Sequence, residues 1–243
     1  MKTIYLLRHT KAGWSESSTD DIARALNQQG RENAVQIGQH LSKNKISPDL
    51  ILCSNATRAQ ETLSFIRPFL PENQAIQVLE SLYLASSETL LHYLTNLDEE
   101  VKSVLIVAHN PGLHELAIHL AGRENIGTSL LLNRIMQRFP SGAFTTVQNQ
   151  AELWRELNQS ESTLVDFVCP SDLPPLLDWN HLHHPINETS ESASFLVNSS
   201  IYSIKRDNYC KTRYFFNQIG NTFKPWRQTS PRLLSPPKNG SGT

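Results

Sequence analysis

The segment that most constrains the fold is residues 103–108, which read Ser-Val-Leu-Ile-Val-Ala. A short apolar run without alternation is typical of a strand that is covered on both faces, as in a parallel sheet flanked by helices. Four further apolar runs of strand length occur at residues 3–7, 49–53, 144–147 and 164–168. The chain therefore predicts a sheet assembled from segments that lie far apart in the sequence.

Segments with a helical period separate these runs. Asn27 is a residue type that caps helices, and four residues after it share one helical face: Ala34, Ile37, Gly38 and Leu41. Further helices are predicted over residues 55–70 and 87–97, and from Pro111 onward. Strands that alternate with helices predict an α/β fold, a three-layer sandwich whose mostly parallel central sheet is flanked by helices.

The composition changes near residue 174. Of the 22 Lys and Arg and 23 Asp and Glu residues, eight and four lie in residues 175–243, which leaves 14 and 19 in residues 1–174. The net charge of −1 is therefore the sum of −5 and +4. The basic segment is rich in Ser, Asn and Pro and has no persistent period, so it predicts a poorly ordered, irregular C-terminal extension of an α/β domain that spans residues 1–174.

Composition also bears on location and partners. No apolar run approaches the roughly 20 residues of a membrane span, and the apolar stretch at the N-terminus is too short for a signal peptide. Cys53, Cys169 and Cys210 are odd in number and widely spaced, as expected in a reducing compartment. These features predict a cytoplasmic protein with no membrane partner. The near-neutral charge gives no overall bias toward nucleic acid, although the basic, aromatic residues 205–232 leave an acidic partner or nucleic acid open for the extension.

Polar groups that suit a phosphate follow three of the predicted strands. These segments are Arg8-His9-Thr10, the stretch from Ser54 to Arg58, and His109-Asn110-Pro111-Gly112. In open α/β sheets, ligands bind in the crevice beyond the carboxyl ends of the strands. Two histidines and two arginines are therefore expected to meet in one crevice.

The same segments resemble the histidine phosphatase superfamily, also called phosphoglycerate mutase-like, and within it the SixA-type phosphohistidine phosphatases. The matching motifs are LLRHTKAGW (6–14), ARALNQQG (23–30), SNATRAQET (54–62) and VLIVAHNPGLHELA (104–117), followed by LVDFVCPSDL (164–173). The resemblance covers residues 1 to about 174 and does not extend to the basic segment. Thr10 departs from the pattern, in which Gly or Ala is commoner after the paired Arg and His.

The resemblance implies a role for each residue of the crevice. His9 is the expected nucleophile, a neutral imidazole that takes the phosphoryl group covalently. Arg8 and Arg58 are expected to hold the phosphoryl oxygens, because a guanidinium group matches phosphate with two parallel hydrogen bonds. His109 is expected to complete the pocket. No metal or other cofactor is implied.

The residue that protonates the leaving group is left open. Glu80 is the first candidate for this general acid, and Asp20 or Asp21 is the alternative. A phosphohistidine substrate relaxes the requirement, since an imidazole that is protonated on its other nitrogen leaves readily.

These features predict a metal-independent phosphohydrolase that works through a phosphohistidine intermediate and dephosphorylates phosphohistidine on a signalling protein. One alternative is a small-molecule phosphomonoesterase of the same superfamily, with a small phosphate ester as substrate and Glu80 as the acid. A second is a catalytically silent protein that binds phosphate or a partner. A third is a metallohydrolase built on His9, His109 and an Asp; the two arginines argue against it, because they would repel a divalent cation.

Overall fold

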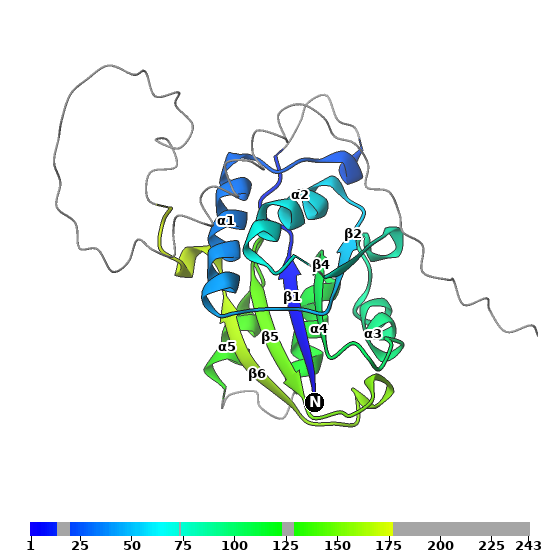
Figure 1. Ribbon diagram of the computed structural model, residues 1–243. Coiled ribbons are helices and arrows are strands. Elements are labelled where there is room, and N and C mark those ends of the chain that lie inside the picture. The colour runs from blue at the N-terminus through cyan, green and yellow to red at the C-terminus, as the bar shows by residue number, and fades with distance from the viewer. Residues whose placement is uncertain (14–19, 73, 123–128, 177–243) are drawn as a thin grey trace, which may run out of the picture. The chain divides into compact units, whose positions relative to one another are not determined.

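The computed structural model describes residues 1–13, 20–72, 74–122 and 129–176 (Figure 1). All of them belong to the first of two units into which the chain divides, Met1–Phe195. From residue 177 onward, the predicted extension lies outside the described residues. Its irregular character and the boundary at residue 174 therefore stay predictions.

A six-stranded sheet forms the centre of the described part. Its strands are β1 (Lys2–Arg8), β2 (Leu50–Ser54), β3 (Ala75–Leu79), β4 (Ser103–Ala108), β5 (Phe144–Asn149) and β6 (Ser162–Val168). The strand order is β3-β2-β4-β1-β5-β6, and the first four strands are parallel to one another. β5 is antiparallel to both of its neighbours. The sheet is thus mostly parallel, as the sequence predicts.

Helices cover both faces of this sheet (Figure 1). Buried residues of α1 (Gln28–Lys43) and α2 (Thr57–Ile66) belong to one core cluster, and those of α3 (Ser87–Thr95), α4 (Gly112–Ala121) and α5 (Leu130–Gln137) belong to the other. The predicted three-layer α/β architecture is confirmed. Among the described helices, none is long and apolar enough to cross a membrane.

The continuous apolar runs are explained by this double coverage. In β2, Leu50 and Leu52 pack in the cluster on the α4 side, whereas Ile51 and Cys53 pack in the cluster on the α1 side. Successive side chains of a strand point to opposite faces, so a strand with two covered faces has no position for a polar residue. Residues 104–108 of β4 are all buried for the same reason.

Two differences from the predicted helices have local causes. The helix expected over residues 55–70 ends at Ile66, and a 3-10 turn, η2 (Arg67–Phe69), carries Pro68, whose ring does not fit an α-helix interior. Helix α5 is not predicted by the sequence pattern, because it is short and buries only Leu132 and Ile135.

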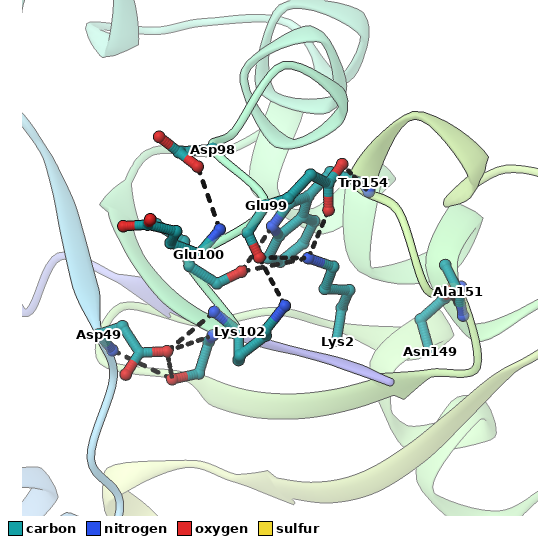
Figure 2. Close-up of polar contacts among 11 residues, drawn as sticks. Lys2, Asp49, Asp98, Glu99, Glu100, Lys102, Asn149, Ala151 and Trp154 are labelled. Atoms are coloured by element: carbon teal, nitrogen blue, oxygen red, sulfur yellow. Dashed lines mark hydrogen bonds and ion pairs between the residues drawn. The ribbon is translucent and has the colours of Figure 1, made fainter.

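Lys2 is the first residue of β1, whose other end carries the predicted site, and Figure 2 shows its side chain beside Glu99 and Trp154. Its fully buried side chain donates from Nζ to Glu99 Oε2 at 2.7 Å and to the Val101 carbonyl at 3.2 Å. The same ammonium group lies 4.8 Å from the ring centroid of Trp154, whose Nε1 donates to the Val101 carbonyl at 2.8 Å. The positive charge of Lys2 is therefore compensated by a carboxylate, a carbonyl oxygen and an aromatic ring, as a buried ammonium group requires.

Candidate active site

The predicted crevice lies where three neighbouring parallel strands end. His9 directly follows β1, Ser54 is the last residue of β2, and His109 directly follows β4. Because β2, β4 and β1 are adjacent in the sheet, their carboxyl ends meet at one edge. The ring centroids of His9 and His109 are 5.0 Å apart, and the two residues are only 9% and 2% exposed.

The ring of His9 has a defined proton position. Its Nδ1 lies 2.7 Å from the carbonyl oxygen of Thr10, which can only accept a hydrogen bond. Nδ1 therefore carries the proton, and Nε2 keeps its lone pair. Burial, assisted by the positive charges of Arg58 and Arg8 and opposed by the Thr10 contact, lowers the pKa of His9 to about 4. His9 is thus neutral at pH 7, the state that a nucleophilic imidazole needs.

The loop that carries His9 is held from two sides. The backbone N–H of Thr10 donates to Thr62 Oγ1 at 3.0 Å, and the N–H of Gly142 donates to the carbonyls of Arg8 and His9, both at 3.1 Å. Gly142 has a φ of +79°, and a Cβ at this position would lie 2.7 Å from Pro170 Cγ. Only glycine fits there without a shift, so the position of His9 depends on a segment more than 130 residues away.

Two arginine side chains enter the crevice with unused hydrogen-bond donors. Arg8 donates from Nη1 to the Phe139 carbonyl at 2.9 Å, and its buried Nε–H has no partner among the described residues. Arg58, in the first turn of α2, donates from Nη1 and Nη2 to the backbone oxygen and the carboxylate of Asp21, at 2.6 and 2.9 Å. Each Nη of a guanidinium group carries two protons, so Arg58 keeps donors for an anion.

Asp21 is a hub that joins three parts of the site. Its carboxylate accepts from the hydroxyl of Tyr83 at 2.7 Å, from Arg24 Nη1 at 2.8 Å and from Arg58 Nη2 at 2.9 Å. The Tyr83 hydroxyl first, and then Arg24, hold the pKa of this carboxyl far below its usual range. Asp21 is therefore ionised at neutral pH, so it orients Arg58 and has no proton to donate.

His109 presents a second ring nitrogen to the crevice. Its Nε2 lies 2.8 Å from Ser54 Oγ, and its buried Nδ1 has no partner among the described residues. Ser54 Oγ also accepts from the Ala56 N–H at 3.3 Å, and when its own proton is donated to His109 Nε2, the ring proton lies on Nδ1. Burial and then the neighbouring His9 lower the pKa of His109 to about 3, which keeps the ring neutral.

The structure thus brings together His9, Arg8, Arg58 and His109. Glu80 is exposed at the start of the 3-10 turn η3 (Glu80–Leu82), and within the described ranges its carboxylate makes no hydrogen bond or ion pair. Its role as an acid stays a prediction.

Two residues that the sequence left without a role contact the site. The ring centroids of Tyr83 and His109 are 5.5 Å apart with nearly perpendicular planes, and Arg58 Cζ lies 5.6 Å from the Tyr83 ring centroid. Ser54 lies within the predicted motif, but its contact with His109 requires the two strand ends to be adjacent. Tyr83 is an ordinary aromatic residue in a turn, and no sequence signal distinguishes it. Within the described residues, no three His, Cys, Asp or Glu side chains gather as a potential metal site.

Comparison with known proteins adds an independent line of evidence. Residues 4–83 match the model of the histidine phosphatase superfamily (branch 1). A phosphohistidine phosphatase SixA homolog of Haemophilus influenzae is 37% identical over 137 residues, which cover 50% of this chain and 79% of that protein. An uncharacterised protein of Mycobacterium leprae is 30% identical over 167 residues, or 68% of this chain and 99% of the relative. The chain belongs to the histidine phosphatase superfamily.

The fold of this histidine phosphatase agrees with that assignment. A solved structure from Agrobacterium tumefaciens, described as a putative phosphohistidine phosphatase SixA, superposes with a TM-score of 0.59 at 28% identity. The alignment covers 70% of this chain and 98% of the other. The chain is therefore a phosphatase of the SixA-like branch.

Proposed function

We propose that this histidine phosphatase hydrolyses phosphohistidine on proteins, with His9 as the residue that takes the phosphoryl group. The observation that carries the proposal is the state of His9. Its ring is neutral, its Nδ1 proton is bound to the Thr10 carbonyl, and its Nε2 lone pair is free beside two guanidinium groups. A nucleophile for phosphorus needs this combination of a free lone pair and nearby positive charge.

The reaction has two steps in this proposal. The lone pair of His9 Nε2 attacks phosphorus, and the bond between phosphorus and the substrate imidazole breaks. Water then attacks the phosphorylated His9, the new P–N bond breaks, and phosphate leaves while the ring returns to its neutral form. The unused N–H groups of Arg8 and Arg58, together with Nδ1–H of His109, would bind the phosphoryl oxygens in both transition states.

The surroundings of the carboxylates support phosphohistidine as the substrate class. An alkyl phosphate releases a strongly basic alkoxide and needs an acid, whereas an imidazole that is protonated on its other nitrogen needs little help. Asp21 is ionised, and Glu80 is exposed and makes no hydrogen bond or ion pair with its carboxylate within the described residues. The Haemophilus influenzae relative is named a phosphohistidine phosphatase, which indicates the same substrate. We further propose that the substrate is a signalling protein of the cytoplasm, where the free thiols of Cys53 and Cys169 would persist.

Trapping the intermediate tests the proposal. The full chain is mixed with a phosphohistidine peptide, quenched without acid within one turnover, and analysed by mass spectrometry for phosphate on His9. We expect the adduct in the wild type and its absence in His9→Gln, and we expect Arg58→Lys to lower kcat roughly 100-fold. Glu80→Gln should leave turnover of the peptide unchanged.

Two results would contradict the proposal. Turnover of an alkyl phosphate but not of the phosphohistidine peptide, with loss of activity in Glu80→Gln, would identify a small-molecule phosphomonoesterase. Binding of both compounds without any turnover would identify a silent binding protein.

A further inference from the structure

Within the described residues, one edge of the sheet lacks the features that normally protect such an edge. β3 lies at one edge of the sheet and reads Ala-Ile-Gln-Val-Leu, without a charged residue or a proline. Its first four residues are exposed, with Ile76 at 40% and Val78 at 47%. The opposite edge strand, β6, carries Asp166 and a register irregularity opposite Thr146 and Val147. Charges and bulges of that kind prevent an edge from pairing with another chain, and β3 has neither.

The backbone of β3 also has groups that no other described residue pairs with. The carbonyl of Leu79 faces β2, because it accepts from the Asn55 N–H at 3.2 Å. Backbone groups of successive residues in a strand point in opposite directions, so the N–H and C=O groups of Ile76 and Val78 point away from the sheet. Ile76 and Val78 are in register with Ile51 and Cys53, which places both side chains on the face that α1 and α2 cover further inward.

This edge leads directly into the catalytic crevice. The 3-10 turn η3 follows β3 and ends one residue before Tyr83, whose ring contacts Arg58 and His109. Leu84 comes next; it is 51% exposed and has a φ of +49°, a left-handed conformation that is unfavourable for leucine. A large apolar side chain is thus held in solvent, at a conformational cost, next in the chain to the site residue Tyr83.

We propose that Ile76, Val78 and Leu84 form a docking strip for an extended, apolar segment of the phosphorylated protein substrate, which adds to β3 as a further strand. The inference rests on the proposed function, because the occupant is the protein part of that substrate. Main-chain pairing with an exposed edge provides affinity, and alternate side chains provide selectivity. The strip gives the enzyme a way to select a phosphoprotein by residues other than the phosphohistidine.

The strand order sets the distance between the docked segment and the reacting group. A strand added outside β3 lies four strand positions from β1, which is roughly 19 Å at the usual strand spacing. An extended chain advances about 3.3 Å per residue, so about six residues connect the docked segment to the phosphohistidine.

Synthetic peptides provide the test. Each peptide has one phosphohistidine and six Gly or Ser residues, followed by either Val-Thr-Val-Thr-Val or five more Gly and Ser residues; both chain directions are made. Free phosphohistidine is the third substrate. We expect kcat/KM of the wild type to be about tenfold higher for the apolar peptide, through KM. Ile76→Asp and Val78→Asp should remove this preference without changing turnover of free phosphohistidine.

Matched controls separate docking from folding and from the chemistry. Val165→Asp places the same charge on the other edge strand at 46% exposure and should keep the preference. Val78→Thr keeps the shape and strand propensity of valine, so it should retain the fold and lose only part of the preference.

Three results would overturn the inference. The first is equal wild-type turnover of both peptides, which would leave the proposed function intact. The second is an equal loss of activity on free phosphohistidine in Val78→Asp, which would mean that the strip supports the pocket instead of a partner. The third is a dimer that Val78→Asp dissociates, which would make a second copy the occupant. If no phosphohistidine compound is hydrolysed, the proposed function itself fails.

Discussion

The pKa of His9 offers a direct test of the site. The pKa of His9, the proposed nucleophile, lies near 4 because its ring is buried, and the positive charges of Arg58 and Arg8 lower the pKa further. The difference between about 4 and the ordinary value of 6.5 corresponds to roughly 3 kcal/mol against protonation. Burial is the largest contribution, so removal of one arginine should recover only part of this free energy. We therefore expect Arg58→Gln to raise the pKa of His9 while leaving it below 6.5.

The measurement is an NMR titration of the histidine Cε1–H signals from pH 3 to pH 8, without phosphate. The His9 signal is identified by its absence from His9→Gln. Arg134→Gln is the matched control, because Arg134 pairs with Asp172 and does not contribute to the pKa of His9. A wild-type His9 midpoint at or above pH 6 would refute the reasoning, since burial and the two arginines would then not lower the pKa as the structure indicates. A midpoint that returns fully to 6.5 in Arg58→Gln would show that charge, and not burial, is the main cause.

Three further predictions concern stability and the Asp21 hub. The unfolded chain binds a proton at His9 below pH 6.5 and the folded chain only below about 4, so the free energy of unfolding should fall by about 2 kcal/mol between pH 7 and pH 5. Urea melts at several pH values give the free energy of unfolding of the wild type and of His9→Gln. We expect this free energy to fall more steeply with decreasing pH in the wild type, and parallel pH profiles of the two proteins would contradict the prediction. Gly142→Ala should cost about 1–3 kcal/mol in the same assay and lower kcat, because the new Cβ meets Pro170, whereas Gly13→Ala, with 3.6 Å of space, should change stability by less than about 0.5 kcal/mol. Asp21→Asn should lower kcat/KM about tenfold, because the guanidinium group of Arg58 would be held less firmly. The exposed Asp98→Asn should leave kcat/KM unchanged. Higher activity in Asp21→Asn would mean that the carboxylate competes with the substrate for Arg58.

The fold was predictable because its signals are local. The run at residues 103–108 coincides with β4, and Asn27 caps α1 by accepting from the Gly30 N–H at 2.8 Å. Both signals depend on a few adjacent residues and on whether a strand or helix is covered. The strand and the start of the helix can therefore be recognised without knowing how the rest of the chain folds. Helix α5 has only two buried residues, which is too little pattern to distinguish a helix from a loop.

The membership of the site was predictable for a similar reason. Arg8, His9, Arg58 and His109 each follow a strand or open a helix, and parallel strands necessarily end at a common edge. The sequence by itself therefore determined which of these groups lie together and at which edge of the sheet they lie.

The state of these groups was decided only by the tertiary structure. The pKa of His9 depends on how much water reaches the ring, and the proton positions depend on the Thr10 carbonyl and, for His109, on Ser54. Asp21 and Glu80 are the same kind of side chain in sequence, yet Asp21 is held ionised by three donors, whereas Glu80 stays exposed. Burial and donor geometry arise from segments that are distant along the chain, and no local pattern records them.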